Sequence, residues 1–243
     1  MISVCIATYN GEKYIKKQLL SILNQLGDYD EIIVSDDNST DNTIKIIKEI
    51  NDRRIKIYFN NGKHGFVKNF ENALVNAKGD YIFLSDQDDE WMDNKVEKTI
   101  YALRDSDFVV SDCITIDSND KIIDYSRFKT FNIKKGFWRL MIKTRYLGCC
   151  MAFNKKVLKA VIPFPKRDDL VEHDLWIAAV SEKYFKVKLI NEPLILYKRH
   201  NNNTSDAGFG KGNNIIIKIY RRIYRYLQII KIKDKIILIN KEE

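Results

Sequence analysis

The sequence predicts an α/β fold in which a mainly parallel sheet is flanked by helices. Apolar runs typical of strands recur at a steady interval, at 2–7, 31–35, 55–59, 81–85 and 107–111. Segments with helical periodicity lie between these runs, and strands that alternate with helices in this way form parallel βαβ units. The chain is 45% hydrophobic and 12% aromatic, which is enough to build the core that such a sheet requires.

The helices of the first half are predicted from apolar residues that recur with the spacing of one helical face. The first helix carries Ile15, Leu19, Ile22 and Leu23, and a second carries Phe66, Phe70, Leu74 and Ala77. Asp93 is expected to cap a further helix, whose buried face carries Val96, Ile100 and Leu103.

The pattern changes after residue 111, where short strands and helices follow one another less regularly. We expect strands at 122–125, 148–153, 187–190 and 194–197, and helices around 137–146, 154–160 and 172–184. Three parts are therefore predicted: a first half at 1–110, a second half of the same globule at 111–205, and a tail at 206–243.

Polar and acidic residues follow three of the predicted strands. The first strand ends in Ala7-Thr8-Tyr9-Asn10, the second in Ser35-Asp36-Asp37-Asn38, and the fourth in Ser85-Asp86-Gln87-Asp88-Asp89-Glu90. Ligands of open parallel sheets bind at the carboxyl ends of the strands. We therefore expect the three exits to form one site.

The fourth exit gathers four carboxylates within five positions, at Asp86, Asp88, Asp89 and Glu90. Acidic loops often serve only as turns or helix caps, and that interpretation stays open for 38–41. It explains 86–90 poorly, because one cap needs one side chain and neighbouring carboxylates repel. A bound Mg²⁺ or Mn²⁺ would relieve this repulsion.

Two other ligand sites are disfavoured. A calcium loop would need Gly at the position of Trp91, and a dinucleotide site would need G-x-G-x-x-G at the first exit. The pattern favours a metal-dependent transferase that acts on a nucleoside diphosphate, because the metal can neutralise the departing diphosphate.

Five segments, in this order, resemble family 2 glycosyltransferases of the GT-A fold: 7–10, 36–41, 85–91, 172–176 and 197–204. The resemblance covers roughly residues 1–205. It implies a Rossmann-like nucleotide-sugar-binding half at 1–110 and an acceptor-binding half at 111–205. It also implies an inverting enzyme that moves a sugar from a UDP- or dTDP-linked donor to a glycan or lipid-diphosphate-linked acceptor in surface polysaccharide synthesis.

The resemblance also implies roles for individual residues. The donor would be held by Ala7, Thr8, Tyr9, Asp37, Asp86 and Asp88. Asp86 and Asp88 match the outer members of the family's D-x-D element. Mn²⁺ or Mg²⁺ would be bound by Asp88 or by Asp89, between which the sequence does not decide, and His200 is an additional candidate ligand.

Asp174 matches the family's general base, which takes the proton of the attacking acceptor hydroxyl. The chemistry requires such a group independently, because an alcohol is a weak nucleophile near neutral pH. A helix cap is the alternative role for Asp174. His173 stands where the family often has Glu, and His-Asp-Leu-Trp resembles rhamnosyltransferase-like members. The Q-x-x-R-W element of processive synthases is absent, so one sugar would be added per encounter.

The tail carries most of the positive charge. From residue 211 to 243 there are nine Lys and Arg against three Asp and Glu, a net +6 of the chain's +8. One helical face collects Ile216, Tyr220, Ile223, Leu227 and Ile230, and another collects Lys218, Arg221, Arg222 and Arg225. A basic amphipathic helix suits an anionic membrane surface. The alternative is a helix that packs on the body with solvated basic residues. Nucleic acid is disfavoured, since no base-reading module is recognisable.

The location and the cysteines complete the sequence-based interpretation. Met1 leads directly into a strand pattern without a signal peptide, and no apolar stretch reaches the ~18 residues of a spanning helix. We expect a cytoplasmic protein, peripheral at the inner face of the membrane. None of the four cysteines has metal-binding spacing, so reduced structural thiols are expected.

Two alternatives to a glycosyltransferase remain. A nucleotidyltransferase would show a glycine-rich basic loop after the first strand, which Ala7-Thr8-Tyr9-Asn10 does not provide. The other is a non-catalytic sugar-nucleotide-binding scaffold at the membrane, against which the intact Asp37, Asp88 and Asp174 argue.

Overall fold

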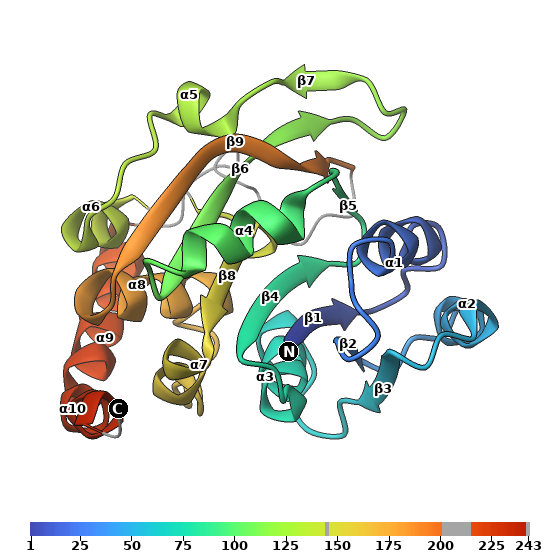
Figure 1. Ribbon diagram of the computed structural model, residues 1–243. Helices are drawn as coiled ribbons and strands as arrows, with labels where there is room; N and C mark the ends of the chain where they lie inside the picture. Colours follow the sequence, from blue (N-terminus) through green and yellow to red (C-terminus); the bar gives the residue numbers. More distant parts are fainter. Residues whose placement is uncertain (144–145, 201–214, 242–243) are drawn as a thin grey trace.

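The computed structural model describes residues 1–143, 146–200 and 215–241. One curled sheet runs through the described residues, with the strand order β3-β2-β1-β4-β8-β6-β9-β5 and β7 paired to β6 (Figure 1). The α/β fold with flanking helices is confirmed. The sheet is mixed, however, because only part of it is parallel.

The first half is the parallel part. It contains β1 (Ile2–Thr8), β2 (Glu31–Asp36), β3 (Ile55–Phe59) and β4 (Tyr81–Asp86), with α1 (Ile15–Leu23), α2 (Thr43–Ile50) and α3 (Phe66–Asn76) between them. β1 lies between β2 and β4, in parallel register with both. Apolar residues of β1, β2 and β4 form the core, as expected for strands covered on both faces. α2 is a helix that was not predicted.

The second half extends the same sheet. Its elements are β5 (Glu90–Trp91), α4 (Lys95–Leu103), β6 (Phe108–Ile116), β7 (Ile122–Asp124), α5 (Arg127–Phe131), α6 (Phe137–Ile142), a 3₁₀ turn (Gly148–Cys150), β8 (Met151–Asn154), α7 (Lys155–Val161), α8 (His173–Tyr184) and β9 (Val187–Lys198). β8 is antiparallel to both β4 and β6, so it joins the two halves of the sheet.

Several predicted boundaries were wrong. The strands expected at 187–190 and 194–197 form the single strand β9, whose register against β6 shifts around Pro193. Pro cannot donate to a ladder, and such an irregularity accommodates it. The helix expected at 137–146 ends at Ile142. Asp93 does not cap α4, because Asn94 occupies the N-cap position, with a positive φ of 64° and no side-chain cap bond.

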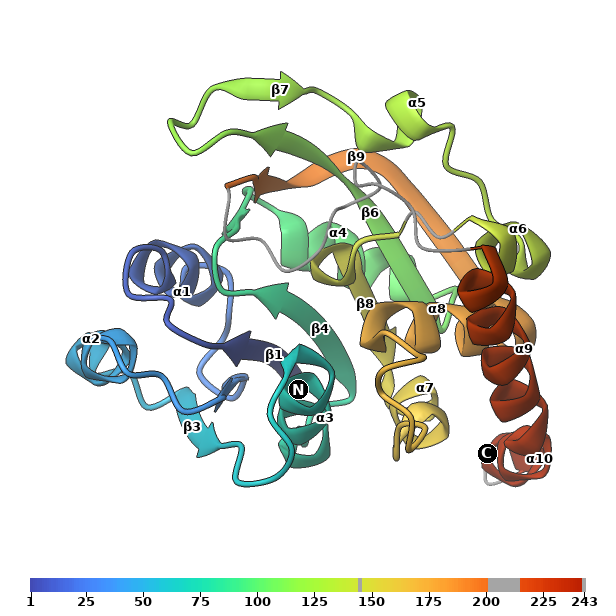
Figure 2. The ribbon, with the colours of Figure 1, turned by 180° about the vertical axis from the view of Figure 1, so that it is seen from behind.

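Two helices, α9 (Ile215–Lys231) and α10 (Lys233–Lys241), end the described chain. They run along the side of the molecule next to α6 and α8 (Figure 2), with α9 packed on α8 and α10 on α7. The predicted apolar face of the tail points to solvent: Ile216, Tyr220, Ile223, Leu227 and Ile230 are all exposed. Arg225, in contrast, is buried. The expectation of solvated basic residues on a packed helix is therefore wrong for Arg225. Residues 201–214, which include part of the predicted tail, lie outside the described residues.

Two further expectations can be compared with the structure. Cys5, Cys113, Cys149 and Cys150 are buried free thiols, as expected. In the part of the chain that the structure describes, no helix combines the length and apolarity needed to cross a bilayer.

Candidate active site

The three polar strand exits meet at one edge of the sheet. Thr8 is in register with Asp36, and Ala7 with Asp86. Gln87 then ties the first exit to the fourth: the Tyr9 amide donates to Gln87 Oε1 at 3.0 Å, and Gln87 Nε2 donates to the Tyr9 carbonyl at 3.1 Å. The sequence did not single out Gln87, because a glutamine in an acidic loop gives no signal of a partner 78 residues away.

On the donor side, Asp37 is held rigidly. Its carboxylate accepts from Asn60 Nδ2 at 2.7 Å and from the Gly65 amide at 2.8 Å, and His64 Nδ1 lies 3.0 Å from Oδ1. These contacts fix Asp37 at the exit of β2, where a nucleotide base or ribose could reach its partly occupied oxygens.

The other predicted donor residues differ in exposure. Thr8 is buried, and its hydroxyl donates to Asp36 Oδ1 at 3.0 Å. Ala7 is half-buried beside Asp86. The Tyr9 ring is 55% exposed, so it alone of the three offers a free side-chain surface to a ligand.

The acidic exit contains a compact group of ligand atoms. One ligand atom each of Asp86, Asp89 and Cys149 lies within 4.8 Å of the others. Asp89 is 4% exposed, and its Oδ1 accepts from the Lys198 amide at 3.0 Å. Its Oδ2 is buried with no hydrogen-bond partner among the described residues. An orphaned carboxylate oxygen beside a second carboxylate fits a divalent cation.

Asp88 points to a different neighbour. Its Oδ2 lies 2.8 Å from His200 Nε2, and the His200 ring stacks on Tyr14 at 4.9 Å between centroids. The contact joins the exit of β4 to the residues that follow β9. Asp88 and His200, both predicted as candidate metal ligands, are therefore brought together.

Burial and neighbouring negative charges act together on the carboxyl groups of this edge. Burial, and then the charges of Asp88 and Asp174, raise the pKa of Asp86 to about 8. Burial, and then Asp88 and Asp86, raise the pKa of Asp89 well above its usual value. The neighbouring Cys149 thiol acts in the opposite direction on the pKa of both groups. These raised pKa values agree with the repulsion predicted for neighbouring carboxylates.

Asp174 lies in the first turn of α8 and faces the same edge, since its charge acts on Asp86. Burial raises its pKa to about 6, while Arg225 and Arg127 act in the opposite direction. Its Oδ1 accepts from the next amide, Leu175, at 2.6 Å. Glu172 occupies the N-cap position of α8 but makes no side-chain cap bond. The bond from the Leu175 amide satisfies a first-turn N–H, so the alternative role of Asp174 at the start of the helix stays open beside that of a base.

His173 is a packing residue that supports Asp174. Its ring stacks on Phe70 at 4.0 Å and meets Phe66 edge-on at 5.7 Å. Neither ring nitrogen has a hydrogen-bond partner among the described residues. Burial lowers its pKa to about 3, so the ring is neutral at physiological pH. His173 packs between α8 and α3, and this packing fixes the position of the adjacent Asp174.

Sequence reasoning did not place three arginines near Glu172 and Asp174. Arg127 is 4% exposed, and its guanidinium lies over the Phe131 ring at 4.6 Å. Arg225 is 6% exposed, and its charge acts on both Glu172 and Asp174. Arg221 also acts on Glu172. Periodicity indicated a helix over Arg221 and Arg225, but it could not show which face would meet the body.

The chain is similar in sequence to known glycosyltransferases. The family model described as Glycosyl transferase family 2 matches residues 3–162. The chain is 28% identical over 185 residues to an Escherichia coli protein, UDP-Glc:alpha-D-GlcNAc-diphosphoundecaprenol beta-1,3-glucosyltransferase WfgD, covering 75% of this chain and 70% of WfgD. It is 28% identical over 222 residues to the Shigella flexneri dTDP-rhamnosyl transferase RfbG, covering 83% of this chain and 74% of RfbG.

Two solved structures share the fold. The S. aureus TarS fragment 1–349 in complex with UDP has a TM-score of 0.64 at 23% identity and covers 82% of this chain. This chain spans 60% of that fragment. The Pyrobaculum calidifontis mannosyltransferase PcManGT, in complex with GDP-Man and Mn²⁺, has a TM-score of 0.62 at 16% identity, with coverage of 98% and 73%. At these identities the likeness concerns the fold.

Proposed function

Because the chain belongs to glycosyl transferase family 2, we propose that it is an inverting, non-processive, metal-dependent glycosyltransferase. It would move a sugar from a UDP- or dTDP-linked donor to a hydroxyl of a lipid-diphosphate-linked glycan in surface polysaccharide synthesis. One observation carries the proposal: Asp174, at the start of α8, packs against Gly148. The next residue, Cys149, shares one compact group of ligand atoms with Asp86 and Asp89 at the exit of β4. A candidate base and a candidate diphosphate site therefore face one another.

The proposed metal ligands are Asp88, Asp89 and His200. Asp88 and His200 already meet at 2.8 Å, and Asp89 offers a buried oxygen without a partner among the described residues. A bound Mn²⁺ or Mg²⁺ would supply the positive charge that stabilises a departing diphosphate. Asp86 lies next to Asp89 and would orient the ribose and diphosphate of the donor.

The donor base and ribose are assigned to the exits of β1 and β2. Tyr9 provides an exposed ring for stacking, and Asp37 provides a fixed acceptor of hydrogen bonds. Ala7 and Thr8 would shape the floor of this pocket. The donors named for WfgD and RfbG are the reason to propose a UDP- or dTDP-linked sugar.

The proposed reaction is a single displacement. Asp174 takes the proton from the acceptor hydroxyl as the hydroxyl oxygen attacks the anomeric carbon, and the nucleoside diphosphate leaves from the opposite face. One displacement inverts the anomeric configuration. A pKa of about 6 keeps Asp174 ionised at neutral pH, yet basic enough to accept a proton.

Peripheral contact with the membrane through 211–243 completes the proposal. Besides the exposed apolar residues of α9, the neighbouring α6 exposes Trp138 and Ile142. The Trp138 and Tyr226 rings stack at 5.7 Å, which holds α6 and α9 together. An exposed apolar stripe with aromatic side chains suits the boundary between headgroups and acyl chains. The proposed location is the inner face of the cell membrane.

A thermal-shift panel of UDP-, dTDP- and GDP-sugars, with and without Mn²⁺, tests this function. We expect one nucleotide class to raise the Tm of the wild type in a Mn²⁺-dependent way, because only the folded site binds it. Asp88→Ala should abolish that shift. Asp105→Ala, which removes an exposed carboxylate two residues after the end of α4, is the matched control and should retain the shift.

Two results would count against the proposal. If no nucleotide sugar stabilises the wild type with Mn²⁺, the protein is not the proposed transferase. If donors bind but neither hydrolysis nor transfer is detected with a panel of lipid-diphosphate-linked acceptors, the non-catalytic scaffold becomes the better account.

A further inference from the structure

We infer that Arg221 and Arg225 of α9 bind the diphosphate that links the acceptor glycan to its lipid. This inference rests on the proposed function, and it assigns the acceptor's charged group to residues outside the donor site. It starts from the side chain of Arg225, which is buried beside the proposed base although its helix is otherwise largely exposed.

Arg225 has hydrogen-bonding capacity that the protein does not use. It is 6% exposed, and its Nε has no hydrogen-bond partner among the described residues. The Nε of Arg221, one turn earlier, is likewise buried and unpartnered within the described chain. Burying a cation is unfavourable unless it is paired and hydrogen-bonded. Two adjacent guanidinium groups in this state are therefore prepared for an anionic ligand.

The nearby carboxylates do not take up this capacity. Glu172 and Asp174 feel the charge of Arg225, but no ion pair joins either of them to Arg225 among the described residues. Arg225 therefore influences both carboxylates through its charge and, in the part of the chain that the structure describes, forms no ion pair with them. A ligand with two phosphate groups could enter between the two arginines and accept the bidentate hydrogen bonds that guanidinium favours.

The two faces of α9 indicate which diphosphate this is. Arg221 and Arg225 are separated by one helical turn, so they share the face that meets α8. The opposite face exposes Tyr220, Ile223 and Leu227. On a path from solvent through α9 to α8, the exposed apolar face therefore comes first, the two arginines second and Asp174 last. A lipid-linked acceptor has the same order: acyl or prenyl chain, diphosphate, sugar hydroxyl.

The donor's diphosphate is the competing occupant, and the geometry disfavours it. It belongs at the exit of β4, where Asp88 and His200 meet and Asp89 presents its free oxygen. The charge of Arg225 acts on Asp174 and that of Arg221 on Glu172, and both arginines belong to α9, which packs on α8. The base thus lies between two anion sites, one for the leaving group and one for the acceptor's carrier.

The test measures binding of decyl diphosphate, below the concentration at which it forms micelles, to the full chain saturated with UDP and Mn²⁺. Isothermal titration would compare the wild type with Arg225→Gln, Arg221→Gln and the double variant. We expect the Kd to rise at least tenfold in each single variant and further in the double variant. Arg225→Lys should recover part of the affinity, because it restores the charge without the bidentate geometry.

Lys231→Gln is the matched control, since it removes one positive charge from an exposed position of the same helix. It should leave the Kd unchanged. Decyl monophosphate should bind more weakly than the diphosphate to the wild type, and decanol should show no difference among the variants. These arms separate recognition of the diphosphate from attraction to any anion or to the alkyl chain.

The inference is overturned if Arg225→Gln binds decyl diphosphate as tightly as the wild type, or if UDP and decyl diphosphate compete. It is also overturned if the variant loses UDP–Mn²⁺ binding in parallel, because the arginine would then serve the donor site or the fold. Failure of the wild type to bind any nucleotide would refute the proposed function instead, and titration without nucleotide would still decide whether the arginines bind a diphosphate.

Discussion

The pKa of Asp174 is set by burial and by nearby positive charges, which act in opposite directions. Burial favours its protonated form, and the charges of Arg225 and Arg127 favour its ionised form. The hydrogen bond from the Leu175 amide also favours ionisation. The resulting pKa of about 6 lies close to neutral pH, where a general base is most effective. The neighbouring His173 stays neutral and contributes packing rather than charge.

The first prediction concerns this base. Asp174→Asn should lower kcat by about 10²–10⁴-fold, the usual contribution of general base catalysis, while the Kd for the donor with Mn²⁺ stays nearly unchanged. In the wild type, kcat/KM should fall as the pH drops below about 6, because protonation removes the base. Steady-state kinetics between pH 5 and 8 would measure both effects. Loss of donor binding together with turnover would show that Asp174 has a structural role.

The sequence predicted individual residues where chemistry is encoded locally. Asp86, Asp88 and Asp89 are consecutive or nearly so, and they follow a recognisable strand, so their shared location needed no tertiary information. Arg225 and Gln87 could not be found in this way. Their roles depend on partners that are remote in the chain, Glu172 and Asp174 for Arg225 and the Tyr9 backbone for Gln87.

At the scale of elements, the donor side is built from loops that are joined by side-chain amides and hydroxyls. Gln87 makes a reciprocal pair of hydrogen bonds with the Tyr9 backbone. Ser39 Oγ accepts from the Asn10 amide at 2.9 Å, and Thr43 Oγ1 accepts from the Gly11 amide at 2.7 Å. The loop after β1 is therefore fixed on both sides, and Tyr9 is presented to a ligand without further ordering.

The second prediction tests this link. Gln87→Met keeps the length of the side chain but removes both hydrogen bonds to Tyr9, each contributing about 1 kcal/mol. Donor affinity should fall by about three- to tenfold, because the free protein would then have to order the loop on binding. Gln228→Met on α9 is the matched control and should leave affinity unchanged. Titration with UDP and Mn²⁺ measures the effect, and equal affinities for wild type and Gln87→Met would refute it.

Sequence patterns determined the type of most elements but not their orientation. The apolar runs at 187–190 and 194–197 were correctly extended, yet the register shift that unites them around Pro193 depends on the partner strand β6. The helical period of the tail was correct for α9. The sequence of α9 does not show which of its faces packs inward, because that depends on the residues of α8 that it contacts in the folded protein. Here the face with Arg225 and Ile229 is the buried one.

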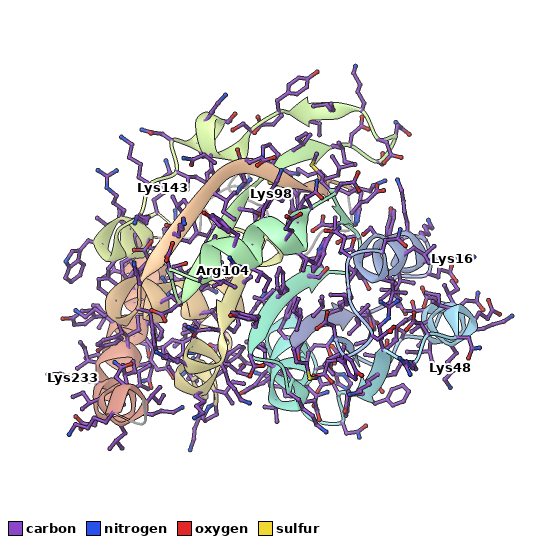
Figure 3. The ribbon with its side chains drawn as sticks, in the orientation of Figure 1. Lys16, Lys48, Lys98, Arg104, Lys143 and Lys233 are labelled. Carbon is purple, nitrogen blue, oxygen red and sulfur yellow. The ribbon has the colours of Figure 1, made fainter. Side chains whose placement is uncertain are left out.

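At the scale of the molecule, charge and apolar surface are segregated. Most of the net charge belongs to 211–243, and the helices of this segment lie along one side, next to α6 (Figure 2). Lys143, after α6, and Lys233, at the start of α10, are exposed on the same side (Figure 3). α9, on which Tyr220, Ile223 and Leu227 are exposed, runs from α6 to α10 on this side (Figure 2). Basic residues around an apolar stripe are expected where a protein rests on an anionic bilayer.

Flotation with liposomes would test this arrangement. The variant Ile223→Asp/Leu227→Asp places two charges on the exposed face of α9, where both native side chains are more than half exposed. We expect the wild type to float with vesicles that contain anionic lipid and the variant to remain largely in the soluble fraction, because a charged side chain opposes insertion into the acyl boundary. Since neither residue is buried, the Tm should change little.

Point substitutions are preferable to deletion of 211–243, because deletion would also remove the buried side chains of Arg225, Ile229, Ile236 and Ile239. The control Val75→Asp/Ile123→Asp adds the same charge at exposed apolar positions on α3 and β7, away from the proposed surface. It should float like the wild type. If both double variants float equally well, α9 does not bind the membrane through its apolar face, and that face must serve another purpose. If only the α9 variant fails to float yet still binds decyl diphosphate in solution, then α9 separates two tasks: its outer face holds the bilayer, and its inner face holds the acceptor.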